Sequence, residues 1–278
     1  MDSPVRQRRE KVRDARDFDQ TALREGGNHE QILHRDYSAH FFRWSFARRF
    51  IKPSDRVLEV GCGPDAPLWK LLFRNIQPHA KRYVGVDLNK TVVTKHQHSL
   101  FLPEFNFVKD WKLVMKATAD RFGDDPVFDI AVNFEVIEHM LPEHGAKLLK
   151  GMWSLLRPGG VLLLSTPCYD GKRHAANHIH EYTVPELQKA IEKAGFTVAR
   201  RFGTFMDTRE LKHVGRHLKS DGLPADTPWA EEEVADAVNI ASTLLGAYYD
   251  NDALSCIFAP LFPNNARNNL WVCRKPGV

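Results

Sequence analysis

The apolar residues along the chain follow two different periods, and their alternation is the main indication of the fold. Short runs of aliphatic and β-branched residues predict buried strands, whereas apolar residues three or four positions apart predict helices. The expected strands are residues 56–60, 83–86, 105–108, 128–133, 161–165, 196–199 and, near the C-terminus, 268–275. The expected helices are residues 29–51, 68–73, 141–156 and 185–194. This order predicts an α/β fold with a mostly parallel, seven-stranded sheet and helices on both of its faces.

The same pattern divides the chain into three parts. Residues 1–52 are expected to form an N-terminal arm and helix, residues 53–204 the core, and residues 205–278 a helical insertion with the closing strand. Helices expected at 207–218 and 229–249 would lie over the carboxyl edge of the sheet, where ligands bind in such folds. The insertion is therefore predicted to be a lid or an acceptor-recognition element.

The arm at residues 1–28 is strongly charged and leaves two interpretations open. It is either a solvated extension or a basic arm that touches nucleic acid. The second interpretation depends on the clustered cations Arg6, Arg8, Arg9, Lys11 and Arg13.

Composition sets limits but indicates no function. The chain has 278 residues, 43% of them hydrophobic, which is enough for a full core. A net charge of +4 permits a phosphate-bearing partner without requiring one. The four cysteines form no C-x-x-C pair, so neither a zinc knuckle nor a redox pair is indicated. Without a signal peptide or a run of about 20 apolar residues, the sequence predicts a cytoplasmic protein with no membrane partner.

A glycine-rich turn follows the first expected strand, in the stretch "VLEVGCGPDA". Gly61, Gly63 and Ala66 have the spacing of a dinucleotide-binding turn, and Asp87 follows at a distance suited to a ribose. Glu59, however, lies inside the strand, where a carboxylate is costly unless a positive charge compensates it. This favours a cationic nucleoside cofactor without phosphate over NAD.

Four stretches then occur in a recognisable order between about residues 55 and 200. They are "VLEVGCGPDA", "YVGVD", "FDIAVNFEVIEHM" and "LLRPGGVLLLSTP". Together they resemble the class I S-adenosylmethionine-dependent methyltransferases, which implies a Rossmann-like fold. One departure is Asp65, which stands where many members continue the turn with a third glycine. The stretches "HRDYSAHFFRW" and "NNARNNLWVC" also resemble phage-borne methyltransferases.

The resemblance implies a set of residues that bind S-adenosylmethionine. Gly61 and Gly63 would line its methionine part, Glu59 would organise the turn, and Asp87 would accept hydrogen bonds from both ribose hydroxyls. Asp110 would take the adenine amino group, with Trp111 stacked on the ring. The full expected set is Tyr37, Glu59, Gly61, Gly63, Asp87, Leu88, Asp110, Trp111 and Asn133. The product would be S-adenosylhomocysteine.

The acceptor side is expected at the carboxyl ends of the fourth and fifth strands. The candidate catalytic residues there are Glu138, His139, His178 and His180, from "EVIEHM" and "NHIHEYT". These stretches also resemble the metal-dependent small-RNA 3′-terminal 2′-O-methyltransferases, which implies a divalent ion on Glu135, Glu138, His139 and His178. Ordinary superfamily members carry similar residues without a metal. The interpretation without a metal is favoured here. Glu138 and His139 would then brace the core, and His178 would be a structural residue or a general base.

Three further alternatives concern the chemistry. Cys168 in "STPC" invites comparison with cytosine-5 methyltransferases, but it follows the fifth strand rather than the fourth, which disfavours a nucleophilic role. Methyl transfer to an oxygen or nitrogen of a small molecule, or of a modified nucleoside in nucleic acid, is the leading hypothesis. The alternatives are the metal-dependent 2′-O-methylation of RNA and a non-catalytic S-adenosylmethionine-binding module.

Overall fold

A computed structural model describes most of the core of the chain. The described residues are 35–74, 77–90, 96–123, 125–169, 171, 175–206, 263–264 and 266–277. The arm expected at 1–28 and the helices expected at 207–218 and 229–249 lie outside these residues. The three-part division of the chain and the lid therefore remain predictions.

The centre of the molecule is a seven-stranded sheet. Its strands are β1 Arg56–Val60, β2 Arg82–Val86, β3 Ser99–Leu102, β4 Phe128–Phe134, β5 Leu156–Pro167, β6 Thr197–Met206 and β7 Ala266–Arg274. Their spatial order is β3-β2-β1-β4-β5-β7-β6. Neighbouring strands from β3 through β5 are parallel, whereas β7 pairs antiparallel with both β5 and β6. The predicted α/β fold class is confirmed.

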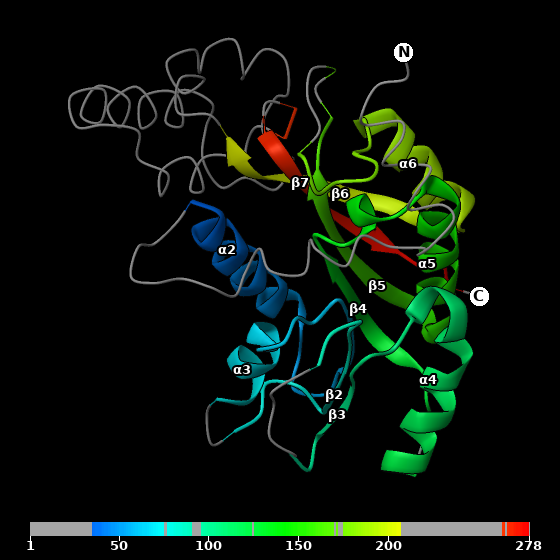
Figure 1. Ribbon diagram of the computed structural model, residues 1–278. Coiled ribbons are helices and arrows are strands. Elements are labelled where there is room, and N and C mark those ends of the chain that lie inside the picture. The colour runs from blue at the N-terminus through cyan, green and yellow to red at the C-terminus, as the bar shows by residue number, and fades with distance from the viewer. Residues whose placement is uncertain are drawn as a thin grey trace, which may run out of the picture.

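Helices cover both faces of this sheet (Figure 1). On one face lie α2 Arg35–Phe50 and α3 Pro67–Phe73; on the other lie α4 Phe107–Phe122, α5 Pro142–Leu155 and α6 Val184–Lys193. No helix in this described part of the chain has both the length and the apolar character that crossing a membrane would require.

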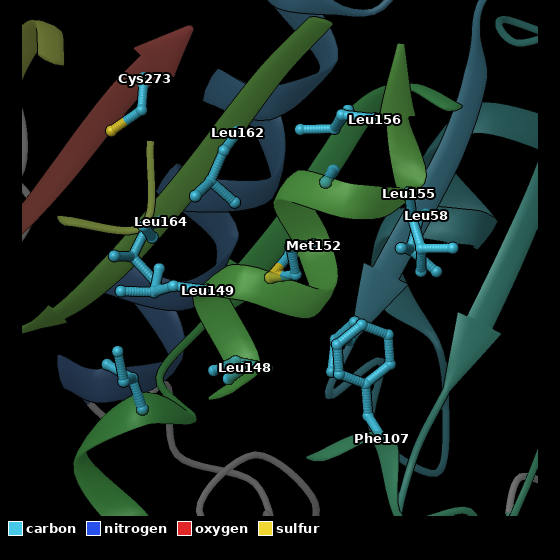
Figure 2. Packing of buried hydrophobic residues seen from close by; sticks show 14 of the residues in the cluster. Leu58, Phe107, Leu148, Leu149, Met152, Leu155, Leu156, Leu162, Leu164 and Cys273 are labelled. Carbon is cyan, nitrogen blue, oxygen red and sulfur yellow. The ribbon is translucent and has the colours of Figure 1, made fainter. Parts of the chain in front are cut away.

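Alternate residues of β1 feed two separate apolar clusters, as the period of a strand requires. Leu58 belongs to the cluster that packs against α4 and α5, together with Phe107 and Met152 (Figure 2). Val57 belongs to the cluster on the opposite face, with Phe46 of α2. Because β1 is buried on both faces, its sequence is apolar at successive positions, with Glu59 as the exception.

The strand expected at 105–108 is wrong, because this segment begins helix α4. Asn106 caps the helix by accepting a hydrogen bond from the backbone N–H of Lys109 at 3.1 Å, and Gly123 ends it at φ +70°. The third strand instead lies earlier, at Ser99–Leu102. The alternation of Phe105, Asn106 and Phe107 imitated a strand over too few positions to distinguish it from a capped helix.

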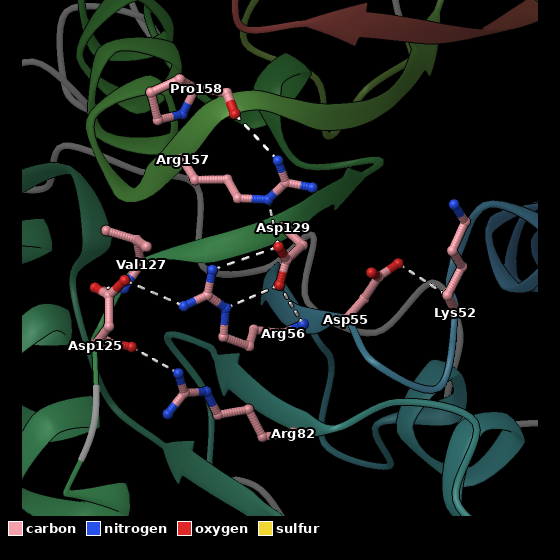
Figure 3. Close-up of polar contacts among 9 residues, drawn as sticks. All are labelled: Lys52, Asp55, Arg56, Arg82, Asp125, Val127, Asp129, Arg157 and Pro158. Atoms are coloured by element: carbon pink, nitrogen blue, oxygen red, sulfur yellow. Dashed lines mark hydrogen bonds and ion pairs between the residues drawn. The ribbon is translucent and has the colours of Figure 1, made fainter. Parts of the chain in front are cut away.

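A carboxylate network ties the amino ends of the strands together, on the side of the sheet away from the glycine turn (Figure 3). Asp129 of β4 accepts hydrogen bonds from the backbone N–H and from Nε of Arg56 of β1, both at 2.8 Å, and another from Nε of Arg157 of β5. Burial acts to raise the pKa of the Asp129 carboxyl, but hydrogen bonds from Arg56 and Arg157 outweigh it and lower that pKa below its ordinary value. The network therefore stabilises the edge opposite the candidate site.

The strand order reverses between β1 and β4, which is where doubly wound sheets bind their ligands. From β1 the chain proceeds outward to β2 and β3, and then returns to the other side of β1 as β4. The crevice at such a switch point opens at the carboxyl ends of the strands. The glycine turn after β1 and the stretch after β4 both lie at this edge.

Candidate active site

The turn after β1 has a backbone that only glycine adopts easily. Gly61 has φ +83° and Gly63 φ +70°. A Cβ added to Gly61 would lie 2.2 Å from Cγ2 of Val136, whereas a Cβ on Gly63 would meet nothing within 4 Å. The N–H of Gly61 donates to the carbonyl of Val86 at the end of β2, at 2.8 Å. Gly61 thus packs against the stretch after β4, and the backbone of Gly63 is left open to a ligand.

Asp87 connects this turn to the end of β2. Its Oδ2 accepts a hydrogen bond from the N–H of Gly63 at 2.7 Å, and its Oδ1 accepts one from the N–H of Asn89 at 2.8 Å. The residue is 6% exposed, and burial outweighs these hydrogen bonds, so that the pKa of its carboxyl is raised. Leu88 follows it and is partly buried. Since each carboxylate oxygen has a second lone pair, Asp87 can still accept from two ligand hydroxyls.

Glu59 is buried beneath the glycine turn. The hydroxyl of Tyr83 on β2 donates a hydrogen bond to Oε2 of Glu59. Burial raises the pKa of the Glu59 carboxyl to about 8, against the weaker lowering effect of that hydrogen bond. Without a ligand, this carboxyl is therefore mostly protonated at pH 7. A cation bound beside it would favour release of the proton.

Asn133 links the end of β4 to the start of the glycine turn. Its side chain is fully buried, and Nδ2 donates to the carbonyl of Val60 at 2.9 Å. Val60 is the residue directly before Gly61, so Asn133 fixes the backbone from which the turn begins. The neighbouring Phe134 is buried in the apolar cluster beneath α2 and α3.

The expected adenine role of Asp110 and Trp111 assumed that they directly follow a strand. Both instead lie on α4. Asp110 is exposed, and Trp111 packs over Gly151 of α5, where an added Cβ would lie 3.0 Å from Cγ of Trp111. At the actual end of β3 the chain turns through Glu104, which has φ +54°. The N–H of Phe105 then donates to the carbonyl of Asp87 at 2.9 Å. Glu104 and Phe105 therefore occupy the position directly after β3 at which the sequence analysis expected Asp110 and Trp111.

Helix α2 reaches the same edge of the sheet from the N-terminal side. Tyr37 belongs to this helix, but the structure does not describe its side chain. Arg43, on the same helix, is buried, with Nη1 at 3.8 Å from Oε1 of Glu135.

Glu135 follows β4 directly and lies in the left-handed backbone region, at φ +55°. Its Oε1 accepts a hydrogen bond from Oγ of Ser165 on β5 at 2.8 Å, and its Oε2 accepts one from Nδ2 of Asn268 on β7 at 2.6 Å. With Arg43, these contacts connect one carboxylate to three separate elements. Several contacts to one side chain allow a residue other than glycine to keep this strained conformation.

Three of the four candidate catalytic residues lie together. Glu138 and His139 belong to the short 3₁₀ helix Ile137–His139 after β4, and His178 comes from the segment after β5. Each offers one ligand atom, and these atoms lie within 4.8 Å of one another. The rings of His139 and His178 are 5.0 Å apart between centroids. The backbone N–H of Ile179 donates to the carbonyl of Glu138 at 2.9 Å, which holds the two segments together.

His180 is turned away from this cluster. Its Nε2 lies 2.7 Å from Oε1 of Glu186 on α6, and its ring packs against Tyr182 with centroids 4.5 Å apart. Only its backbone N–H is directed to the cluster, donating to the carbonyl of Glu138 at 3.0 Å.

The thiol of Cys168 is poorly suited to act as a nucleophile. Burial raises the pKa of this thiol to about 12. A cysteine nucleophile reacts as the thiolate, which needs a lowered pKa. The raised pKa of the thiol is consistent with the interpretation that disfavoured Cys168.

Comparison with known proteins places this arrangement in a family context. A family model for a methyltransferase domain matches residues 33–201. A protein of Mycolicibacterium smegmatis named "Probable S-adenosylmethionine-dependent methyltransferase" is 30% identical over 198 residues, covering 66% of this chain and 70% of that protein. A tRNA U34 carboxymethyltransferase of Syntrophotalea carbinolica is 33% identical over 111 residues, covering 36% of this chain and 34% of that protein.

Among solved structures, a SAM-dependent methyltransferase from Archaeoglobus fulgidus has the same fold. Its TM-score is 0.50 at 16% sequence identity, covering 87% of this chain and 95% of that one. At this identity the likeness concerns the fold alone.

Proposed function

This chain belongs to the class I S-adenosylmethionine-dependent methyltransferases, and from that premise we propose that it methylates an oxygen or nitrogen of an acceptor that enters over the carboxyl ends of β4 and β5. S-adenosylmethionine supplies the methyl group as an electrophile on a sulfonium. The new bond forms at the acceptor atom while the sulfur–methyl bond breaks, its electron pair remaining on sulfur in S-adenosylhomocysteine. The acceptor's proton passes to a neighbouring base or to water.

The cofactor side of the proposal depends on the glycine turn and Asp87. The open face of Gly63 allows the backbone to approach the ligand, and Asp87 is held so that each of its oxygens can accept a ribose hydroxyl. Asn133 orients the turn through Val60. Glu104 and Phe105, at the end of β3, replace Asp110 and Trp111 as the proposed neighbours of the adenine.

The single observation that carries the acceptor side is the cluster of Glu138, His139 and His178. It lies at the same edge of the sheet as the glycine turn, since Val136, two residues before Glu138, contacts Gly61. Carboxylate and imidazole groups suit the task of holding an acceptor and removing its proton. His180 is proposed to act as a positioning residue only, through its backbone bond to Glu138.

The acceptor is proposed to be a small molecule or a nucleoside in nucleic acid. The net charge of +4 and the similarity to a tRNA-modifying protein support the second source, while the carboxyl edge of a doubly wound sheet suits either. If the acceptor is nucleic acid, its affinity for the protein should fall steeply as the salt concentration rises, because phosphate contacts release counterions.

The test is transfer of label from methyl-tritiated S-adenosylmethionine to nucleic acid and to a metabolite extract, offered separately. Label in either pool, lost in Asp87→Asn and kept in the exposed control Asp120→Asn, supports the proposal. Label whose transfer is insensitive to Asp87→Asn contradicts the proposed cofactor site. Label in neither pool, despite tight binding of the cofactor, contradicts the proposed acceptor classes.

A further inference from the structure

We propose that Arg43 binds a carboxylate group of the methyl acceptor, which makes that acceptor a small organic acid. The inference rests on the proposed function, because it names the class of molecule that enters over the carboxyl ends of β4 and β5. The feature that carries it is the buried guanidinium of Arg43, which makes a long ionic contact with Glu135 instead of a hydrogen bond.

The guanidinium of Arg43 has hydrogen-bonding capacity left for a ligand. Its side chain is 3% exposed, and its Nε has no hydrogen-bond partner among the residues that the structure describes. Its Nη1 lies 3.8 Å from Oε1 of Glu135, beyond the range of about 2.7–3.2 Å for a hydrogen bond. A buried charge costs free energy unless hydrogen bonds and an opposite charge compensate it. A bound carboxylate would supply both.

Glu135 is held apart from Arg43 by its other contacts. Ser165 of β5 donates a hydrogen bond to its Oε1 at 2.8 Å, and Asn268 of β7 donates one to its Oε2 at 2.6 Å. Arg43 itself is fixed from the opposite side, because Phe46 and Ala47 of the same helix are buried in the apolar cluster beneath α2. The separation between the two charges is therefore set by the fold.

Arg56, at the opposite edge of the sheet, shows how this chain completes an arginine–carboxylate pair. Its Nε donates to Oδ2 of Asp129 at 2.8 Å, and its backbone N–H donates to the same oxygen at 2.8 Å. That pair is closed and stabilises the edge far from the candidate site. The pair of Arg43 and Glu135 is left open at the edge where ligands bind in doubly wound sheets.

Helix α2 places Arg43 over the acceptor half of the sheet. Phe46 lies three positions after Arg43, on the same side of the helix, and its ring packs against Phe202 of β6 with centroids 4.9 Å apart. In the sheet, β6 lies beyond β5 and β7, whereas Gly63 and Asp87 follow β1 and β2 on the other side of β4. A carboxylate at Arg43 therefore belongs to the acceptor rather than to the cofactor.

The charges favour a carboxylate over a phosphate. The planar guanidinium can donate two parallel hydrogen bonds to a carboxylate. Arg43 and Glu135 together carry no net charge, which suits one negative charge on the ligand better than the two of a phosphate monoester. The burial of the guanidinium also excludes a phosphodiester that remains within a nucleic acid chain. The local structure thus favours a small molecule over nucleic acid as the acceptor.

The bound carboxylate is not the atom that receives the methyl group. Hydrogen bonds from a guanidinium stabilise the negative charge and make the carboxylate oxygens poorer nucleophiles. The methyl group is therefore transferred to another oxygen or nitrogen of the acceptor. The product keeps its carboxylate and remains an acid.

The first experiment measures binding of simple carboxylates to the full chain saturated with S-adenosylhomocysteine. The probes are formate, acetate and benzoate, each compared with its neutral amide and with inorganic phosphate by saturation-transfer NMR. At least one carboxylate should bind saturably, with its amide and phosphate at least about 10-fold weaker. Arg43→Gln should raise the Kd of that carboxylate by about 10-fold to 100-fold. Arg43→Lys, which keeps the charge but loses the planar fork, should raise it by a smaller factor.

The matched control is Arg49→Gln, the same substitution at an exposed position on the same helix. Its carboxylate Kd should change by less than about twofold, because an exposed charge contributes little. Every variant should bind S-adenosylhomocysteine with unchanged affinity, which also confirms that it folds. Loss of that affinity in Arg43→Gln would assign Arg43 to the cofactor and overturn the inference. Equal binding of each carboxylate and its amide, or no binding of any carboxylate, also overturns it.

Methyl transfer separates this inference from the proposed function. The labelled product from the metabolite extract should be retained by an anion exchanger at pH 7 and released on acidification. A neutral product, a base-labile methyl ester, or label confined to nucleic acid overturns the inference and leaves the proposed function intact. Label in neither pool contradicts the proposed acceptor classes, and the binding measurements then decide alone whether Arg43 is a carboxylate site.

Discussion

Gly61 and Val136 are in such close contact that a Cβ on Gly61 would lie 2.2 Å from Cγ2 of Val136. One residue begins the glycine turn after β1, and the other lies between Glu135 and Glu138 after β4. The cofactor turn and the candidate acceptor cluster therefore share a packing contact. A change in either one is expected to affect the other.

Gly61→Ala should weaken binding of S-adenosylhomocysteine by about 10-fold to 100-fold. The substitution combines the left-handed backbone, which costs a residue with a side chain about 1–2 kcal/mol, with the clash against Val136. Gly123→Ala is the control, because it has φ +70° but open space around its Cβ, and its cofactor affinity should be unchanged. Adding Val136→Ala should recover part of the loss, as calorimetry can measure. Equal affinities for all variants would contradict the packing argument.

Asp87→Asn should lower cofactor affinity by about 10-fold or more, since hydrogen bonds to a charged group contribute about 1.5–3 kcal/mol. The amide can direct its single oxygen to the N–H of Gly63 or of Asn89, but it cannot reproduce both bonds. Asp120→Asn makes the same change at an exposed position on α4, where Asp120 pairs with Lys116, and should have no effect. Calorimetric titration with S-adenosylhomocysteine measures both.

Glu59 should make the protein less stable as the pH rises from about 4.5 to about 8. The folded state raises the pKa of this carboxyl to about 8, from an ordinary value of 4.5, so the folded state holds more protons than the unfolded state in that window. The free energy of unfolding should fall by up to about 1.4 kcal/mol per pH unit. Glu59→Gln removes this titration.

Thermal denaturation at several pH values, without cofactor, measures this effect of Glu59. The melting temperature of Glu59→Gln relative to the unmodified protein should increase toward pH 8. The exposed control Glu192→Gln should give no such trend. A pH-independent difference for Glu59→Gln would show that its carboxyl does not titrate in this range.

Asp129→Asn should destabilise the fold by about 2 kcal/mol or more without changing cofactor affinity. Breaking a fully buried charge network costs about 3–5 kcal/mol, and the half-exposed Arg157 reduces that figure here. Since the folded state lowers the pKa of Asp129, its contribution is present above the ordinary carboxyl pKa and is lost as the pH falls through the lowered value. Urea denaturation at pH 7 and pH 3 should therefore show a smaller difference at the lower pH. Weakened cofactor binding would contradict its placement at the far edge of the sheet.

Much of the fold could be predicted because local pattern and final structure agree there. Strands β1, β2, β4 and β5 are largely buried on both faces, so each leaves a mostly apolar run, with polar exceptions such as Glu59 in β1 and Asp129 in β4. The segment 105–108 failed because a strand-like alternation of aromatic residues was overruled by the cap at Asn106 and the packing of Phe107 on α5. Residues 205–206 belong to β6, so that strand also extends further than the pattern at 196–199 suggested.

Some residues of the candidate site could likewise be predicted from the sequence, and others could not. The glycine turn depends on local backbone geometry and Asp87 directly follows the next strand, β2, so their residue types and spacing could be predicted. His178 and His180 are indistinguishable in the sequence, because they lie two residues apart in one polar stretch. The structure separates them, placing one ring beside His139 and the other on Glu186.

By itself, the sequence determined the α/β alternation, the glycine turn and the residue types available at the carboxyl ends of β4 and β5, because periodicity and backbone demands are local. Only the tertiary structure decided which of those residues meet. The pairing of β4 with β5 brings Glu138 and His139 to His178, and the contacts of Glu135 with Ser165 and Asn268 remove it from that group. Side-chain direction depends on partners contributed by distant strands, which no local pattern contains.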